Sequence, residues 1–371
     1  MIYLDYAASS PPFLQAIDEM RTVAVAQFGN PGSIHKLGAE ARKILQNSRI
    51  LLAGLTNVRP EEIFFTSGGT ESCNWAVRAG CAPGGRKHIV CNSAEHSAVL
   101  AAVAEMGEIG YDVTYLSPDR DGRILPEAVE AALRPDTALL CVQAVNNETG
   151  VIQDVDALAE LAHKIGARYF CDGVQSFGHV MQNLHRADLI SLSAHKLGGP
   201  RGVGCLIVRQ PLSPAPMLLG GGQEFGLRSG TENLPGIAGF ACAAALSAEA
   251  LPQEQPRLAA LTALFEEMLR QACPGIRIAG EGAARSSILC CAFPGISGEE
   301  MAARLDLKGI CASPGAACAA RSAKPSHVLL SMGYPPQEAA EFVRFSLGRN
   351  TTAEEIRRTA AVISDIVKMR S

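Results

Sequence analysis

The sequence predicts an α/β protein built around a mostly parallel sheet. Short runs of β-branched, aromatic and other apolar residues alternate along the chain with segments of helical periodicity. This alternation favours strand–helix–strand units, in which each helix carries the chain back so that successive strands run parallel. A second observation is a polar segment with two prolines at 251–260, LPQEQPRLAA, which predicts a hinge between a large part and a smaller α/β part.

The expected strands follow one another from residue 61 to residue 209. EEIFFTSGG (61–69) predicts a strand that ends in a glycine turn, and a helix is expected over 70–80. KHIVCNS (87–93) predicts a second strand, followed by a helix over 96–110. The remaining expected elements are strands within 111–118, 137–145, 167–174, 187–195 and 202–209, and helices over 126–134 and 154–166. Beyond the hinge, helices are expected at 265–272, 299–307 and 351–367.

The bulk composition excludes several classes of protein. A chain of 371 residues with 47% hydrophobic and 19% charged residues predicts a soluble globular protein with a sizeable core. The net charge of −4 gives no electrostatic reason to expect binding to nucleic acid or to an anionic membrane. The first residues, MIYLDYAASSPP, lack the pattern of a signal peptide, and no stretch is expected to be long and apolar enough to span a bilayer. We therefore expect a cytoplasmic protein.

The 12 cysteines are scattered, and many lie inside apolar runs such as LLCVQAV and SILCCAF. In a long chain without a signal peptide, this pattern favours buried, reduced thiols over disulfides. The chain contains no CxxC pair, so no structural zinc site is expected, and the scattered spacing also argues against an iron–sulfur protein. No bound metal is predicted.

Lys196 is the first candidate for chemistry. It follows the expected strand 187–195 and precedes a Gly-Gly-Pro turn. The carboxyl ends of the strands are where α/β proteins bind their ligands. Taken alone, Lys196 is better explained as a solvated loop lysine. A second signal is TSGGTES (66–72), where a strand, a glycine pair and Thr70 at the start of a helix can form a phosphate cradle.

Two further residues follow expected strands. An apolar strand delivers Asp172, with Gln175 three residues beyond it. A carboxylate there requires a cation or hydrogen-bond donors, and a protonated pyridine nitrogen is one such partner; a helix N-cap or an arginine partner explains Asp172 equally well. His96 can be a capping or core histidine, or its ring can lie over a flat aromatic cofactor. A lysine able to form a Schiff base, a carboxylate, a phosphate cradle and a stacking ring together indicate a pyridoxal phosphate site.

The chain also resembles a known family, the cysteine desulfurases of the NifS/IscS group, within the class-V aminotransferases of fold-type-I pyridoxal phosphate enzymes. The resemblance runs nearly from end to end. The matching motifs occur in the family's order: YLDYAAS (3–9), FGNPGSIH (28–35), TSGGTES (66–72), EH (95–96), NNETG (146–150), CDGVQS (171–176), SAHKLGGPRGVG (193–204), GGGQE (220–224), RSGTEN (228–233), GAAC (315–318) and RFSLGR (344–349).

The resemblance implies a fold and a domain organisation. The fold is the aspartate-aminotransferase-like fold of fold type I, with a mostly parallel seven-stranded sheet in a large pyridoxal phosphate domain over 14–250. Residues 1–13 and 251–371 are expected to form the small domain, and this domain is expected to carry the catalytic-cysteine loop at about 311–326. The enzyme is expected to be a homodimer.

The resemblance also assigns roles to individual residues. Lys196 binds the cofactor covalently and moves protons, and His96 stacks on the pyridine ring; with Cys318 they are the expected catalytic residues. Asp172 pairs with the ring nitrogen, and Gln175 donates a hydrogen bond to the phenolic oxygen. The residues expected to hold the phosphate are Gly69, Thr70, Ser193 and His195, together with Thr231 from the other subunit. Asn147 and Arg344 are expected to bind the substrate, with Arg344 holding its carboxylate.

The implied activity is that of a cysteine desulfurase. L-cysteine becomes L-alanine, and its sulfur is held as a persulfide on Cys318. An acceptor protein then takes the sulfur for iron–sulfur cluster assembly or other thio-cofactor synthesis. The small residues on both sides of Cys318 fit a sulfur carrier, whereas its spacing alone indicates only a surface-loop cysteine. The chain departs from the family at Pro314, in the cysteine loop, and at Phe225, where arginine is usual.

Other readings stay open at this point. A selenocysteine lyase is chemically adjacent, and another class-V enzyme such as an aminotransferase would not need Cys318. A catalytically idle partner in sulfur assembly is a third reading. The presence of Lys196, Asp172 and His96 argues against that reading.

Overall fold

The computed structural model describes residues 1–81, 85–314 and 325–369. Its centre is a seven-stranded sheet with the strand order β2-β8-β7-β6-β5-β3-β4. β8 runs antiparallel to both of its neighbours, and the other strands run parallel to one another. All seven strands expected from the sequence are present: β2 (Ile63–Thr66), β3 (His88–Asn92), β4 (Asp112–Leu116), β5 (Thr137–Cys141), β6 (Arg168–Asp172), β7 (Leu189–Ser193) and β8 (Gly204–Val208). The predicted mostly parallel α/β sheet is confirmed.

Helices cover both faces of this sheet. The expected helices are α3 (Gly69–Gly80), α4 (Ser97–Glu108), α5 (Pro126–Ala132) and α6 (Val155–Lys164), preceded in the chain by α1 (Leu14–Ala26) and α2 (Lys36–Thr56). Local caps fix where two of them begin. The Asp154 side chain accepts a hydrogen bond from the Ala157 backbone N–H at 3.0 Å, and His96 Nδ1 accepts one from the Ala98 N–H at 3.1 Å. Short 3₁₀ turns lie at Pro60–Glu62, Leu184–Arg186, Ala194–Lys196 and Glu224–Gly226.

The smaller part of the molecule contains an antiparallel sheet with the order β12-β13-β10-β9. Its strands are β9 (Arg277–Ile278), β10 (Ile288–Ala292), β12 (Ser313–Pro314) and β13 (Phe342–Ser346). The N-terminal β1 (Ile2–Tyr3) pairs in parallel with β11 (Ile310–Cys311), so the chain begins in this part. The helices are α8 (Gly298–Asp306), α9 (His327–Ser331), α10 (Pro336–Ala339) and α11 (Ala353–Lys368).

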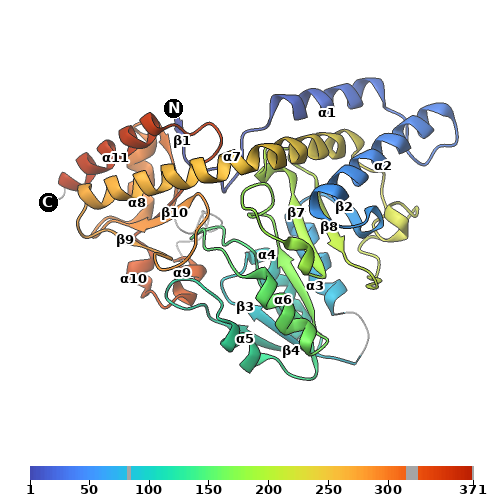
Figure 1. Cartoon of the computed structure of the whole chain (residues 1–371), viewed down its shortest axis with the longest axis horizontal. Coiled ribbons are helices and arrows are strands. Elements are labelled where there is room, and N and C mark those ends of the chain that lie inside the picture. Colours follow the sequence, from blue (N-terminus) through green and yellow to red (C-terminus); the bar gives the residue numbers. More distant parts are fainter. Residues whose placement is uncertain (82–84, 315–324, 370–371) are drawn as a thin grey trace.

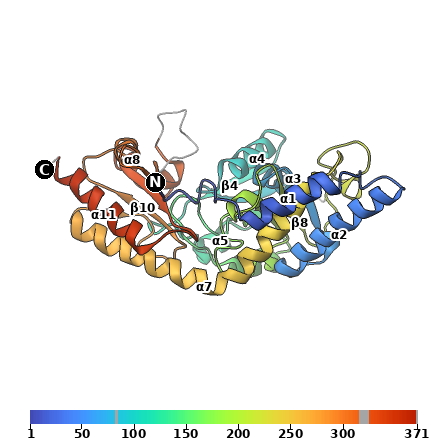
Figure 2. The same cartoon turned by 90° about the horizontal axis from the view of Figure 1, so that it is seen from above.

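One helix joins the two parts. α7 (Leu234–Ala272) is 39 residues long and crosses the whole molecule, packing along α1 and α2 at one end and along α11 at the other (Figures 1 and 2). The hinge expected at 251–260 is therefore wrong, because this segment is helical. Pro252 and Pro256 are four residues apart on one exposed face, so the carbonyl groups that lose their N–H partners face water.

α7 also corrects a second expectation. By length and composition it is apolar enough to cross a membrane, whereas the sequence was expected to contain no such stretch. In the structure it is a core helix. Phe240 and Ala244 pack into the core beneath the large sheet, and Phe265 and Leu269 pack into a separate core around β10 and β13. The burial of both ends explains the apolar composition.

The cysteines of the described residues are all free. Nine are buried, whereas Cys242 and Cys311 are half-buried. Burial raises the pKa of several of these thiols, including Cys81 to about 12. Among the described residues, no group of three or more His, Cys, Asp and Glu side chains is arranged to hold a metal ion.

Candidate active site

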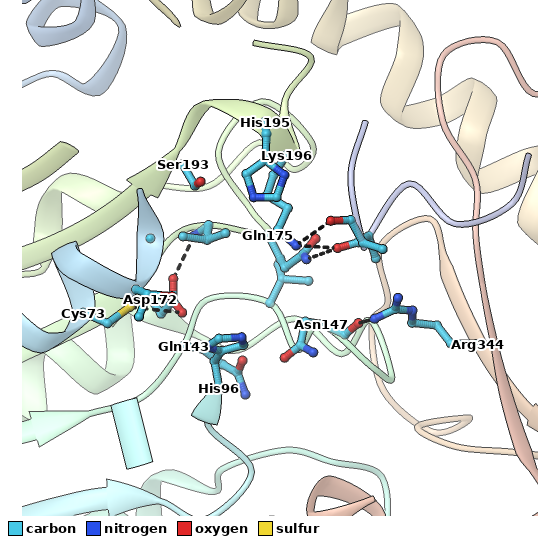
Figure 3. A pocket seen from close by; sticks show the side chains of 16 residues that line it. Cys73, His96, Gln143, Asn147, Asp172, Gln175, Ser193, His195, Lys196 and Arg344 are labelled. Carbon is cyan, nitrogen blue, oxygen red and sulfur yellow. Dashed lines mark hydrogen bonds between the residues drawn. The ribbon is translucent and has the colours of Figure 1, made fainter. Parts of the chain in front are cut away.

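A pocket lies at the carboxyl ends of the parallel strands, where the sequence predicted the site (Figure 3). The strands place its chemistry because parallel strands end at the same edge of a sheet. The small part of the molecule closes the pocket from the other side with Arg344 of β13. Ten residues singled out from the sequence line it: Gly69, Thr70, His96, Asn147, Asp172, Gln175, Ser193, His195, Lys196 and Arg344.

Lys196 extends into the pocket from the short turn after β7. Its Nζ donates hydrogen bonds to the backbone carbonyl oxygens of Ala7 and Ala8, at 2.8 and 3.1 Å. Gln175 Nε2 donates to the same Ala7 oxygen at 2.9 Å. The N-terminal segment thus forms one wall of the pocket and fixes the direction of the lysine side chain.

Asp172 is the last residue of β6 and is 7% exposed. Its Oδ1 accepts hydrogen bonds from Ser191 Oγ at 2.7 Å and from the Val174 backbone N–H at 3.0 Å. The Cys73 thiol lies 3.7 Å from Oδ2. These donors satisfy part of a buried carboxylate that faces the pocket, and a cation there would complete its partners.

His96 stands at the N-cap of α4 and presents its ring to the pocket. Burial lowers the pKa of His96, the nearby Asp172 carboxylate opposes that effect, and Lys196 and His327 add to it. The net direction is downward, which favours the neutral ring. Since Nδ1 accepts from the Ala98 N–H, the hydrogen-bond network assigns the proton to Nε2. A neutral, flat ring is suited to stacking on an aromatic group.

The glycine turn before α3 has the geometry of an anion cradle. Gly68 adopts φ 151° and ψ −175°, a conformation that essentially only glycine takes, and α3 begins at the next residue. Gly204 of β8 packs against it so closely that a Cβ there would lie 2.8 Å from the Gly68 Cα. Gly68, Gly69 and Thr70 line one hollow together with Ser193, at the start of α3, where the first backbone N–H groups have no partner within the helix.

Arg344 is 2% exposed and is held from two directions. Its Nη1 donates to the Asn147 carbonyl oxygen at 2.9 Å, and Nη2 lies 2.8 Å from Asp5 Oδ1. Its Nε has no hydrogen-bond partner among the described residues. A buried guanidinium that lines the pocket with an unsatisfied donor is suited to bind a carboxylate.

The structure does not bring two of the sequence-derived candidates into this pocket. Thr231 is exposed and lies outside the residues that line it. Cys318 lies outside the described residues, as does most of the loop expected at about 311–326.

Sequence reasoning assigned no role to several residues around the pocket. Ala7 and Ala8 act through backbone carbonyls, and Asp5 acts through Arg344; their only signal was the motif YLDYAAS. Cys73 and Gln143 line the pocket as well. Glu95, the residue before His96 in the chain, is buried, and its Oε1 accepts a hydrogen bond from the Gln143 backbone N–H at 2.6 Å. Burial and the charge of Asp172 raise the pKa of Glu95 to about 8.

The residues present fit pyridoxal phosphate. A buried carboxylate, a lysine directed into the pocket, a neutral ring and a glycine cradle at a helix start match its ring nitrogen, its carbonyl carbon, its ring face and its phosphate, respectively. Fold and pocket together define a pyridoxal phosphate enzyme of fold type I.

Comparisons with known proteins agree with this class. Residues 2–359 match the family model "Aminotransferase class-V". A cysteine desulfurase of Bradyrhizobium diazoefficiens is 40% identical over 375 residues, covering 100% of this chain and 95% of the relative. A solved NifS-like protein superposes with a TM-score of 0.92 at 31% identity, covering 99% of each chain. The structure described as SspA in complex with cysteine has a TM-score of 0.82 at 32% identity, covering 94% of this chain and 99% of that one.

The chain therefore belongs to the cysteine desulfurase family of class-V aminotransferases. It is a pyridoxal phosphate-dependent enzyme, as the sequence predicted.

Proposed function

We propose that this enzyme takes sulfur from L-cysteine, releases L-alanine, and holds the sulfur as a persulfide on Cys318 until an acceptor protein removes it. The observation that carries the proposal is that Arg344 and Lys196 line the same pocket. An α-amino acid presents a carboxylate and an amino group a short distance apart. Arg344 would bind the carboxylate, and Lys196 would meet the amino group at the cofactor.

Each residue then has a task at a stated atom. Pyridoxal phosphate, when bound, supplies an electron sink for the electrons released at the substrate Cα. Asp172 keeps the ring nitrogen protonated and so maintains that sink, and Gln175 orients the phenolic oxygen. His96 stacks on the ring and excludes water from one face. Lys196 Nζ removes the proton from Cα and returns protons to the carbon skeleton.

The sulfur step balances without an added oxidant or reductant. The Cys318 thiolate attacks the substrate Sγ, a sulfur–sulfur bond forms, and the bond between Cβ and Sγ breaks. The electron pair stays with the carbon skeleton, which gains a proton and leaves as L-alanine. The products are one alanine and one persulfide.

We also propose the partners and the setting. Delivery of the persulfide sulfur to an iron–sulfur scaffold or another carrier protein follows from the resemblance to IscS-type enzymes. A reducing compartment such as the cytoplasm is supported by the eleven described cysteines, which are all free.

A homodimer is part of the proposal. Large apolar side chains are exposed in two regions. The first is α2 with the segment before it, and the second is the segment 218–225. These side chains are Phe28 (73%), Ile34 (99%), Ile50 (50%), Leu219 (89%) and Phe225 (61%). Such side chains are suited to a subunit interface. Thr231, which is exposed and outside its own pocket, would then reach the phosphate of the partner's site. We propose the domain limits as 14–250 and 1–13 with 251–371.

The test compares the wild-type protein with Cys318→Ser, both loaded with pyridoxal phosphate. Each is incubated with L-cysteine, and both alanine and intact mass are measured. We expect alanine from the wild type alone, with one extra sulfur on its Cys318 peptide. Equal alanine from both variants would assign the attack to another thiol. A preference for selenocysteine, or amino transfer that persists in Cys318→Ser, would replace the proposal with a selenocysteine lyase or an aminotransferase.

A further inference from the structure

A second hollow adjoins the main pocket on the side of the glycine turn. The two share Ala8 and four residues that are expected to hold the phosphate, Gly69, Thr70, Ser193 and His195, so these expected ligands lie on the boundary between them. On its outer side, this hollow is lined by side chains to which the sequence assigned no role: Ser9, Ser67, Glu71 and Arg201.

The expected phosphate ligands leave a charge unbalanced. A phosphate monoester carries close to two negative charges near pH 7. Gly69, Thr70, Ser193 and His195 offer backbone N–H groups, two hydroxyls and one imidazole. Burial lowers the pKa of His195 to about 4, and Lys196 and Arg201 act in the same direction. The imidazole is therefore neutral near pH 7, and none of these four residues supplies a full positive charge.

Among the described residues, three cationic side chains line the two hollows: Lys196, Arg344 and Arg201. They differ in the partners that they already have. Lys196 serves the carbonyl carbon of the cofactor, and Arg344 is paired with Asp5 at 2.8 Å. Arg201 is exposed, and its Nη2 lies 3.5 Å from Ser9 Oγ, which in turn lies 3.3 Å from His195 Nδ1.

Glu71 also lines the outer hollow, and its carboxylate already has a cationic partner in Arg228. Arg228 Nε donates to Glu71 Oε1 at 2.8 Å, and the Ser67 N–H donates to Oε2 at 2.8 Å. Burial alone would raise the pKa of Glu71, but these hydrogen bonds lower it. Glu71 thus stays ionised near the cradle, and its partner Arg228 is occupied.

We propose that Arg201 is a further cofactor-binding residue, with its guanidinium supplying the positive charge that faces the phosphate. The inference rests on pyridoxal phosphate as the cofactor. Arg201 lies in the turn between β7 and β8, five residues after Lys196, so one loop delivers both the covalent and the ionic contact. The exposed position allows the long side chain to reach the anion without disturbing a core.

The test measures cofactor binding to the apoprotein and not turnover. The only tryptophan, Trp75, is on α3, which begins at the cradle, so its fluorescence reports binding. Pyridoxal phosphate and pyridoxal are titrated into the wild type, Arg201→Gln and Arg201→Lys. Arg358→Gln, which removes an exposed arginine of α11, is the matched control.

We expect Arg201→Gln to weaken the binding of pyridoxal phosphate about tenfold, because a charge-assisted contact is lost. The binding of pyridoxal, which has no phosphate, should be unchanged. Arg201→Lys should retain most of the affinity, and raised salt should reduce the difference. An equal loss for both ligands, or no loss for either, would overturn the proposal. A wild type that binds the cofactor but forms no alanine would refute the proposed function and leave the assignment of Arg201 standing.

Discussion

Arg344 and Asp5 form a buried ion pair, 2.8 Å apart, between residues 339 positions apart in the chain. The side chains are 2% and 18% exposed. The pairing of β1 with β11, together with the bridge between Asp5 and Ser346, brings the N-terminal segment to β13. This pair orients the guanidinium that we expect to bind the substrate carboxylate.

Replacing Asp5 with Ala should be strongly destabilising. It leaves a buried guanidinium without its counter-charge, which typically costs about 3 kcal/mol of unfolding free energy. Glu105→Ala is the control, because the pair Arg78–Glu105 has the same 2.8 Å separation but is nearly half exposed on both sides. There we expect a loss below about 1 kcal/mol. Urea unfolding of both variants checks the difference, and similar losses would mean that burial of the Asp5 pair has been overrated.

Arg344→Gln should weaken binding of L-cysteine about tenfold or more, since the carboxylate loses a charged fork. Cysteamine, which lacks the carboxylate, should bind the variant and the wild type equally. Arg344→Lys should be intermediate because lysine keeps the charge but not the two parallel donors. Changes in the cofactor absorbance measure both ligands. If the binding of cysteamine is weakened as much as the binding of cysteine, Arg344 supports the pocket and does not bind the carboxylate.

Glu95 predicts a pH dependence of stability. Its pKa is raised from the ordinary 4.5 to about 8 in the folded chain, by burial first and by Asp172 second. Between these values the unfolded chain has lost the proton and the folded chain retains it, so stability falls as pH rises from about 5 to 8. Glu95→Gln keeps the oxygen that accepts from Gln143 but cannot ionise.

The difference in unfolding free energy between Glu95→Gln and the wild type should therefore move in favour of the variant from pH 5 to pH 8. Urea midpoints at the two pH values measure this. Glu108→Gln, at an exposed glutamate of the same α4, should show no such change. A difference that is independent of pH would mean that Glu95 is already ionised at pH 5.

Mixed dimers test the shared site. Lys196→Ala and Thr231→Ala should each be nearly inactive alone. In a mixed dimer, one of the two sites would have both an intact Lys196 and an intact Thr231 from the neighbouring subunit. Random exchange should then restore about a quarter of the wild-type activity. Alanine formation after unfolding and joint refolding measures it, and no recovery, with a monomer in ultracentrifugation, would refute the dimer.

The sequence predicted the large sheet well because its strands are short apolar runs separated by helical periodicity. For the same reason it placed Asp172, Lys196 and His96 near one another, since each follows a strand and parallel strands share an edge. It was wrong about α7, where Pro252 and Pro256 indicated a break. The free energy gained by burying both ends of that helix is larger than the free energy lost with the hydrogen bonds that the prolines remove.

The supporting contacts could not be predicted in this way. The carbonyls of Ala7 and Ala8 hold Lys196, and the carboxylate of Asp5 holds Arg344. These three residues lie in an N-terminal segment that has no periodic pattern and is far from Lys196 and Arg344 in the sequence. They reach the pocket because β1 pairs with β11 and Asp5 pairs with Ser346 in the folded chain. Even the resemblance, which supplied the motif, assigned them no task.

The distribution of thiols has a consequence for the fidelity of sulfur transfer. A persulfide gives its outer sulfur to any thiolate that reaches it, so the enzyme's own cysteines are the first competitors of the acceptor. Nine of the eleven described cysteines are buried. Even Cys73, which lines the pocket, has its pKa raised well above the usual range by burial and by Asp172, and so remains a thiol. Burial therefore keeps these thiols from accepting the persulfide sulfur, so that transfer takes place with an acceptor thiol at the protein surface.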